Sequence, residues 1–315
     1  LKADALDSDI KSLKKAARQN VGPEILRRVQ QIIETGLIEL KNDFKIYWKD
    51  YPIAKLIPGI DYLNPQVDLI IDEMIENNEK LKLSNYLQKW LNEKIRSELE
   101  SLIELKTLKE NNPELRALSY HLYENNGVVK RESVLPYLKK LDQDQRKILR
   151  KIGVKFGRYH IFLFKLFKPN AVSLRILLWK SFNEKNINLL PPTFGLNFLE
   201  EKKYTNKDFM LLCGFEKFDN FFVRIDILER LFLMILNSSR SNEKDIKIVP
   251  EMLNLLGCTK ENFIKLLKKM NYNTYNKKNE IYFKYIPLKR SFKKKEVKKD
   301  LSDNPFGVLR QLNLK

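Results

Sequence analysis

Hydrophobic and polar residues at the start of the chain follow first the period of a helix and then that of a strand. Residues 1–40 predict helix, because Pro23 suits a first helical turn and the apolar residues behind it fall on one face. That face comprises Ile25, Leu26, Val29, Ile32 and Ile33. Residues 44–48 then alternate between apolar and polar, and a second extended run follows at 52–56, which predicts a small hairpin.

Helical patterns dominate the next segment of the chain. Ser84 is suited to cap a long helix that runs past Lys106. Its apolar face consists of Leu87, Trp90, Leu91, Ile95, Leu99, Leu102 and Ile103. Pro113 begins a new segment, in which we expect helices at 114–124 and 131–151.

An extended segment interrupts these helices at residues 154–169, where the alternation is that of a strand. A helix is expected next at 171–182, with Asn170 as its N-terminal cap. Pro191-Pro192 and Gly195 are typical of a linker, and we place a domain boundary there.

The last third shows a recognisable order of elements. The expected elements are a helix at 224–237, a strand at 246–249, helices at 250–256 and 260–270, and a strand containing Ile281, Phe283 and Tyr285. Gly257 ends one helix and Thr259 caps the next. This is the order of a winged helix, with 260–270 in the place of the recognition helix, although the same order also serves protein contacts.

Together these patterns predict a mainly α fold with small β-hairpins (α+β), in which a helical body precedes a winged-helix-like C-terminal domain. Disorder is excluded for most of the chain, because 43% of its residues are hydrophobic and 11% are aromatic. The expected domains are a helical domain with a small hairpin at 1–110, a basic helical and extended domain at 111–195, a winged-helix-like domain at 196–286 and a basic, flexible tail at 287–315.

The whole chain has a net charge of +19, and the positive charge is concentrated in its last two-thirds. Residues 1–100 hold 16 Lys and Arg against 17 Asp and Glu, whereas residues 101–200 hold 18 against 9 and residues 201–315 hold 25 against 14. Such asymmetry indicates a region that binds a polyanion. The alternative is lysine enrichment in an AT-rich genome, because Asn and Ile are also abundant.

The most basic segment is Arg146 to Lys180, which holds ten basic residues and no acidic one. Its candidate contacts to nucleic acid are Arg150, Lys151, Lys155, Arg158, Lys165 and Lys168. Aromatic residues are interleaved with them and could stack on bases: Phe156, Tyr159, His160, Phe162, Phe164 and Phe167. The alternative is that the aromatic residues form core and the charges are simply solvated.

A second group of candidate contacts lies on the helix expected at 260–270. Its apolar residues recur at helical spacing and must face the core, which turns Lys265, Lys268 and Lys269 toward its outer side. Residues 284–299 add eight Lys and Arg against Glu296, either as an arm that contacts phosphates or as a solvated tail.

Catalytic and metal-binding motifs are missing from the sequence. None of the ten glycines is followed by lysine, so the chain has no P-loop for ATP. His121 and His160 lie far apart in sequence, and Cys213 and Cys258 belong to no CxxC pair. Paired acids such as Asp142 and Asp144 fit helix caps better than a magnesium site. We therefore expect no catalytic residues and no cofactor in this chain.

The segment Val154-Lys155-Phe156-Gly157-Arg158-Tyr159-His160-Ile161-Phe162-Leu163 resembles a known family. Further matching stretches are Leu166-Phe167-Lys168-Pro169, Leu174-Arg175 to Trp179, Pro52 to Gly59, Arg224 to Arg230, Pro250 to Cys258 and Asn304 to Leu309. Over nearly its whole length, the chain is similar to the C-terminal region of alphaproteobacterial helicase-related proteins, relatives of the mitochondrial ATP-dependent RNA helicase of superfamily 2.

This resemblance implies that a DExH motor of two RecA-like domains precedes the segment in the same polypeptide and holds the ATP and magnesium. The start at Leu1 fits either a processed protein or a segment of a longer one. The implied function is non-catalytic: to bind and guide single-stranded RNA or DNA beside the motor. The alternative is a platform that docks the helicase to a nuclease or another partner, with Phe306 and Leu309 as an apolar anchor.

No apolar run approaches the roughly 20 residues that span a bilayer. No signal segment precedes the first expected domain either. We therefore expect no membrane partner. The expected location is the bacterial cytoplasm, with the mitochondrial matrix as the alternative.

Overall fold

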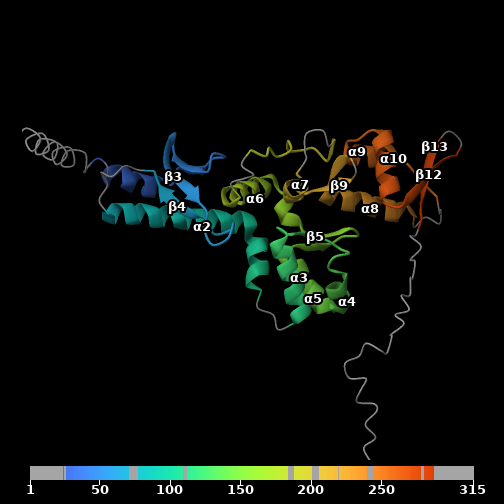
Figure 1. Ribbon diagram of the computed structural model, residues 1–315, viewed down its shortest axis with the longest axis horizontal. Coiled ribbons are helices and arrows are strands. Elements are labelled where there is room, and N and C mark those ends of the chain that lie inside the picture. The colour runs from blue at the N-terminus through green and yellow to red at the C-terminus, as the bar shows by residue number, and fades with distance from the viewer. Residues whose placement is uncertain are drawn as a thin grey trace, which may run out of the picture.

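Helices and small antiparallel sheets are mixed along the described part of the chain in the computed structural model (Figure 1). The structure describes residues 24, 26–70, 77–108, 112–183, 188–200, 206–218, 220–239, 245–277 and 280–286. The tail expected at 287–315, with its apolar anchor and most of the second basic run, lies outside the described residues. Each described sheet is built from strands that are close in sequence, so the units follow one another along the chain.

The N-terminal unit is a four-stranded sheet in the order β1-β2-β3-β4, preceded by a helix that includes residues 26–35. The helix expected at 1–40 is wrong at its C-terminal end, because residues 38–40 form β1. Its strands are β1 (Ile38–Leu40), β2 (Lys45–Trp48), β3 (Tyr51–Ile57) and β4 (Gln66–Leu69). Strands β2 and β3 pair antiparallel, which confirms the predicted hairpin. Lys49 takes a positive φ of 54° in the short turn between them, as a tight hairpin turn requires.

The long helix α2 (Asn77–Thr107) packs against this sheet and continues into the next unit. Its buried face contains leucines on both sides of Leu99, where the backbone leaves helical geometry and the helix bends (Figure 1). The predicted cap at Ser84 is wrong, because the helix already begins at Asn77 and Ser84 lies inside it. The apolar periodicity also starts earlier than expected, with Leu83 fully buried.

The middle unit combines helices with a three-stranded sheet in the order β5-β7-β6. Its helices are α3 (Pro113–Glu124), α4 (Leu135–Lys140), α5 (Gln143–Ile152), the 3₁₀ helix η1 (Phe164–Phe167) and α6 (Pro169–Phe182). Its strands are β5 (Val128–Lys130), β6 (Val154–Phe156) and β7 (His160–Leu163).

Three predicted boundaries in the middle unit differ from the structure. The extended segment expected at 154–169 ends with β7 at Leu163, and residues 164–167 form η1 instead. The helix expected at 131–151 is divided into α4 and α5, because Asp142 forms a capping box with Gln145 and so begins a new helix. Asn170 does not cap α6, because that helix starts at Pro169, whose ring suits the first helical position. Lys168 therefore occupies the cap position, without a side-chain hydrogen bond.

The last third contains two small sheets joined by α8 (Ile225–Ser239). The first has the order β8-β10-β9 and was not predicted. Its strands and helix are β8 (Phe198–Glu200), α7 (Lys207–Leu212), β9 (Phe215–Phe218) and β10 (Phe221–Arg224). The second has the order β11-β13-β12. It is formed by β11 (Ile246–Lys247), β12 (Tyr272–Lys277) and β13 (Glu280–Tyr285), with α9 (Pro250–Leu256) and α10 (Lys260–Lys269) between β11 and β12.

The predicted ends of α9 and α10 are confirmed. Gly257 closes α9 in the left-handed conformation, with a φ of 67°. The Thr259 side chain caps α10 by accepting a hydrogen bond from the amide of Asn262 at 3.3 Å.

A fully buried arginine on α6 joins several elements of the core. The Arg175 guanidinium donates hydrogen bonds to the carbonyl oxygens of Asn126 at 2.7 Å and of Leu166 and Leu212 at 3.0 Å. Burial lowers the pKa of Arg175 to about 10. This residue belongs to the basic segment in the sequence, but its charge is enclosed by the backbone of the loop before β5, of η1 and of α7.

We expect the change Arg175→Met to lower the free energy of unfolding by about 2–4 kcal/mol, because three buried carbonyl groups lose their donor while the cost of a buried charge is relieved. Urea denaturation would measure this loss. The control Arg96→Met, at an exposed position of α2, should change stability by less than about 0.5 kcal/mol. Equal effects of the two changes would contradict the role given to Arg175.

Candidate nucleic-acid interface

Four of the predicted cations come together where α5 ends and β6 begins. Arg150 and Lys151 lie in the last turn of α5, which Gly153 closes in the left-handed conformation with a φ of 108°. Lys155 follows in β6, and Lys165 lies in η1 with its side chain against Gly153. We call Arg150, Lys151, Lys155 and Lys165 the α5–β6 basic surface.

Two of these cations each lie beside an aromatic ring, on opposite faces of β6. The Arg150 guanidinium lies 5.6 Å from the centre of the Phe156 ring, and the Lys155 ammonium lies 5.4 Å from the centre of the Phe164 ring. Phe164 is 47% exposed, so its ring is open to solvent. A cation and an accessible ring therefore lie side by side, the combination that binds a phosphate and a stacked base.

Most of the charge on this surface is not neutralised. Lys165 forms an ion pair with Glu100 of α2 at 3.2 Å. Arg150, Lys151 and Lys155 are exposed and have no carboxylate partner within the described part of the chain. Part of this arrangement has a structural reason, because cations in the last turn of a helix are stabilised by its dipole. Lys155, in a strand, has no such reason.

The other two cations predicted in this segment lie elsewhere. Arg158 is exposed in the turn between β6 and β7, at the opposite end of that hairpin from Gly153, and its guanidinium lies 5.9 Å from the Phe232 ring of α8. Lys168 is exposed at the start of α6. The structure therefore separates Arg158 from the α5–β6 basic surface by the length of a strand.

The predicted lysines of α10 are exposed, as the apolar periodicity indicated. Phe263, Leu266 and Leu267 are fully buried. Lys265, Lys268 and Lys269 are exposed on the other side of the helix. Lys265 and Lys268 form no ion pair with a carboxylate among the described residues. They form a second basic surface, on a different unit from the first.

Several residues of the basic segment serve the fold instead. Arg146 donates to the carbonyl oxygen of Leu138 at 2.8 Å, Lys180 donates to that of Leu189, and Arg175 is buried. Among the interleaved aromatic residues, His160 and Phe162 are buried, and Phe156, Tyr159 and Phe167 are half-buried. Of these six rings, only that of Phe164 is well exposed, so base stacking by the segment as a whole is not available.

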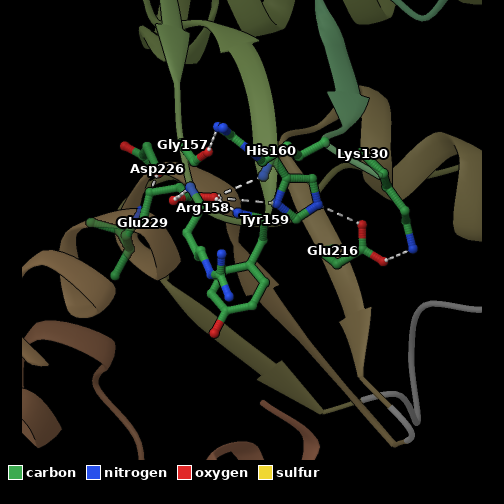
Figure 2. Close-up of polar contacts among 10 residues, drawn as sticks. Lys130, Gly157, Arg158, Tyr159, His160, Glu216, Asp226 and Glu229 are labelled. Carbon is green, nitrogen blue, oxygen red and sulfur yellow. Dashed lines mark hydrogen bonds and ion pairs between the residues drawn. The ribbon is translucent and has the colours of Figure 1, made fainter. Parts of the chain in front are cut away.

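The central feature that the sequence did not reveal is a clamp between the β6–β7 turn and α8 (Figure 2). The Glu229 carboxylate accepts hydrogen bonds from the backbone amides of Arg158 at 2.6 Å and of Tyr159 and His160 at 2.8 Å. The Arg131 guanidinium fixes the same turn by donating to the carbonyl oxygen of Gly157 at 2.8 Å. We call the turn and Glu229 the Glu229 clamp.

A buried ion network continues from the clamp. His160 is only 3% exposed; its Nε2 lies 2.9 Å from the Glu216 carboxylate, and its Nδ1 lies 3.8 Å from Glu229, an ion-pair distance but too long for a hydrogen bond. Lys130 reaches the other oxygen of Glu216 at 2.8 Å. The network thus joins four elements: His160 of β7 lies between Glu216 of β9 and Glu229 of α8, and Lys130 of β5 pairs with Glu216.

The pKa values in this network all favour the charged forms. Burial alone would lower the pKa of His160, but its hydrogen bond with Glu216 and the charge of Glu229 outweigh burial and raise it. Burial alone would raise the pKa of both glutamates. The pKa of Glu216 is nevertheless lowered by its hydrogen bonds with His160 and Lys130, and that of Glu229 is lowered by the charge of His160 and by the hydrogen bonds from the turn amides. The direction of each shift favours an imidazolium between two carboxylates.

The clamp joins two stretches that are far apart in the sequence, since Gly157 to His160 lie in one and Glu229 in the other. Gly157 is required there because a Cβ atom would lie 2.3 Å from the Glu229 carboxyl carbon. No spacing rule joins residues 71 apart, so this contact could be found only in three dimensions. A single signal was available: Gly157 interrupts an otherwise alternating segment.

Metal-binding groups and membrane-spanning helices are both absent from the described residues. None of their side chains forms a group of three or more His, Cys, Asp or Glu that could hold a metal ion. None of the described helices combines the length and apolar character needed to cross a membrane. Comparisons of the chain with protein-family models, with curated proteins and with solved structures gave no match.

The ion network should make stability depend on pH with a defined sign. The pKa of His160 is raised in the folded protein, so His160 adds stability below its ordinary pKa of 6.5, and this stability is lost as the pH rises through the raised pKa. The pKa values of Glu216 and Glu229 are lowered, so these residues add stability above their ordinary pKa of 4.5, and this stability is lost on acidification. The difference in unfolding free energy between wild type and His160→Gln should therefore be largest between pH 4.5 and 6.5 and shrink toward pH 9. Urea midpoints across this range would measure it.

The control for this experiment is His121→Gln on α3, which should leave the pH profile of the wild type unchanged. A constant difference between wild type and His160→Gln at every pH would show that His160 is not charged in the folded protein.

The change Gly157→Ala should break the Glu229 clamp, because the added Cβ would collide with the carboxylate and displace the turn. We expect a loss of about 2–4 kcal/mol in unfolding free energy, mainly from hydrogen bonds to a charged group. Gly195→Ala is the matched control: nothing lies within 4 Å of its added Cβ, and only its φ of 90° is unfavourable, which costs about 1 kcal/mol. Similar losses in the two variants would argue against the clamp.

Proposed function

We propose that this chain binds and guides single-stranded RNA or DNA as a non-catalytic C-terminal region of an ATP-dependent superfamily 2 helicase. The family resemblance implies motor domains in the same polypeptide, and ATP and magnesium belong to those domains. This chain contributes binding alone, in the bacterial cytoplasm.

The observation that carries the proposal is the uncompensated charge of the α5–β6 basic surface. Arg150, Lys151 and Lys155 are exposed and unpaired among the described residues. Lys155 also lies beside the exposed ring of Phe164. Phosphate groups supply the missing negative charge, and release of their counterions supplies most of the binding free energy. An exposed ring beside the cations favours single strands, whose bases are free to stack.

The second basis of the proposal is the order of elements at the C-terminal end. Helix α8, strand β11, helices α9 and α10 and the β12–β13 hairpin follow one another, and β13 lies between β11 and β12 in the sheet. We assign this order to a winged-helix-like unit with α10 in the recognition position. On this assignment, Lys265, Lys268 and Lys269 stand on the helix that reads nucleic acid in related folds.

A protein-docking role is the second candidate, and one observation favours it. Four large apolar side chains are exposed around the linker before β8: Phe182 at 42%, Leu190 at 80%, Phe194 at 54% and Leu196 at 44%. Apolar residues gathered in this way mark contact surfaces for other proteins. On this reading, the chain docks its helicase to a nuclease or another partner, and the cations only keep it soluble.

Salt-dependent binding separates the two functions. For a labelled single-stranded oligonucleotide, the logarithm of the association constant should fall linearly with the logarithm of the salt concentration. Changing Arg150, Lys151 and Lys155 together to Gln, or Lys265, Lys268 and Lys269 together to Gln, should reduce that slope by roughly 0.7 for each phosphate that the variant no longer neutralises. Fluorescence anisotropy between low and high salt would measure it.

The matched control changes Lys55, Lys82 and Lys89 to Gln; these lysines are 52%, 66% and 78% exposed in the N-terminal third. This variant should keep the wild-type slope. Equal slopes in all three variants would assign the basic surfaces to solvation and favour the docking function.

A further inference from the structure

The sheet β11-β13-β12 has one face in the core cluster and a second face whose described side chains lie outside that cluster. Side chains alternate between the faces of a strand. Phe283 is fully buried, and Ile246 and Tyr272 are less than 8% exposed, so their face packs against the helices. The cross-strand pair of Tyr275 and Tyr282 is one position out of step with Phe283 and therefore belongs to the other face. We call this other face the outer face.

The outer face combines aromatic rings with cations. The rings of Tyr275 and Tyr282 lie 6.2 Å apart between centres at an interplanar angle of 22°. The Lys277 ammonium lies 5.6 Å from the centre of the Tyr282 ring, and the Lys284 ammonium lies 5.9 Å from that of Tyr275. Each ring thus has a cation above it, supplied by the neighbouring strand.

Charge pairing on this face leaves these two cations available. Glu280 is paired with Lys247 and accepts a hydrogen bond from the Tyr282 hydroxyl at 3.3 Å. Lys277 and Lys284 form no ion pair with a carboxylate among the described residues. The Asp245 carboxylate faces the Tyr275 hydroxyl. Cross-strand aromatic pairs stabilise hairpins, which accounts for the two rings but not for the two lysines placed over them.

We propose that the outer face binds the bases of a single nucleic-acid strand by stacking on Tyr275 and Tyr282, with Lys277 and Lys284 at the adjoining phosphates. The inference rests on the proposed function and adds the site and the mode of binding. The side chains of Tyr275 and Tyr282 are half-buried, so part of each remains open to solvent. Aromatic rings on a sheet surface stack with the bases of a single strand, whereas a duplex hides its bases.

The site also differs from the one that the winged-helix order suggests. Helix α10 packs against the buried face of the sheet, through the cluster that contains Phe263, Leu266 and Phe283. Its lysines therefore lie on the opposite side of the unit from the outer face. The outer face and the α10 lysines can be altered separately, so base stacking can be tested independently of α10.

The test compares two probes of equal length, a fluorescein-labelled strand of twelve thymidines and an abasic strand with the same phosphates, each titrated at high salt to reduce the phosphate contribution. Wild type should bind the strand with bases at least about 5-fold more tightly, since one stacked base contributes that much or more. The double variant Tyr275→Leu, Tyr282→Leu should lose this preference and keep its affinity for the abasic strand. The variant Tyr275→Phe, Tyr282→Phe should retain the preference, because it keeps both rings.

A second measurement on wild type covers the case in which the leucine variant does not fold. Irradiation of a complex with 5-iodouracil-substituted strand should crosslink Tyr275 or Tyr282, as peptide mass spectrometry would show. Crosslinks confined to other residues, or equal wild-type affinity for both probes, would overturn the stacking site while leaving the proposed function intact. Failure to bind either probe even at low salt would overturn both.

Discussion

A buried carboxylate must be surrounded by hydrogen-bond donors, and Glu229 meets this requirement with three consecutive amides from a turn 71 residues earlier in the chain. Removing a carboxylate from water costs several kcal/mol, and its hydrogen bonds to the amides return a similar amount. The net stabilisation is therefore small, but burying the carboxylate without the amides, or the amides without the carboxylate, would lower the stability of the fold. The clamp thus selects one orientation of α8 on the β6–β7 hairpin rather than adding much stability.

The rest of the architecture follows from that orientation. Between the clamped amides, Tyr159 inserts into the core of the C-terminal unit, where its ring meets Phe232 edge-on at 5.8 Å. His160 points the other way, toward Glu216 of β9. The β6–β7 hairpin is short, and its far end carries the α5–β6 basic surface. Because a strand is stiff, fixing the turn also fixes where that surface lies relative to the C-terminal unit.

Local patterns in the sequence were sufficient for the elements but not for the contacts between them. The β2–β3 hairpin, α9 and α10 were predictable because turn residues and caps act within a few positions. Strands β5 and β8–β10 were missed, since strands of three or four residues are too short to show a period. Ser84 and Asn170 are residue types that often cap helices, but α2 begins earlier, at Asn77, and α6 begins at Pro169.

The basic segment shows the same limit for the candidate site. One-dimensional charge could not tell Arg175, whose guanidinium is held by three backbone carbonyls, from Arg150, whose guanidinium is exposed. Carbonyl acceptors are present at every residue, so no pattern of side chains marks the arginine that will use them. The same holds for Glu229, whose partners are amides. Arg175 and Glu229 both pair with backbone groups, so no complementary side chain in the sequence marks them as buried.

The positions of the two basic surfaces also restrict the path that a nucleic-acid strand would take across the molecule under the proposed function. The α5–β6 basic surface and the C-terminal unit lie at opposite ends of the β6–β7 hairpin, and Arg158 is exposed at the turn, over Phe232 of α8. A strand that touches both basic surfaces therefore passes the turn. Arg158 is positioned there by its own amide, which Glu229 holds. The clamp that orients the two units thus also positions Arg158 at the turn.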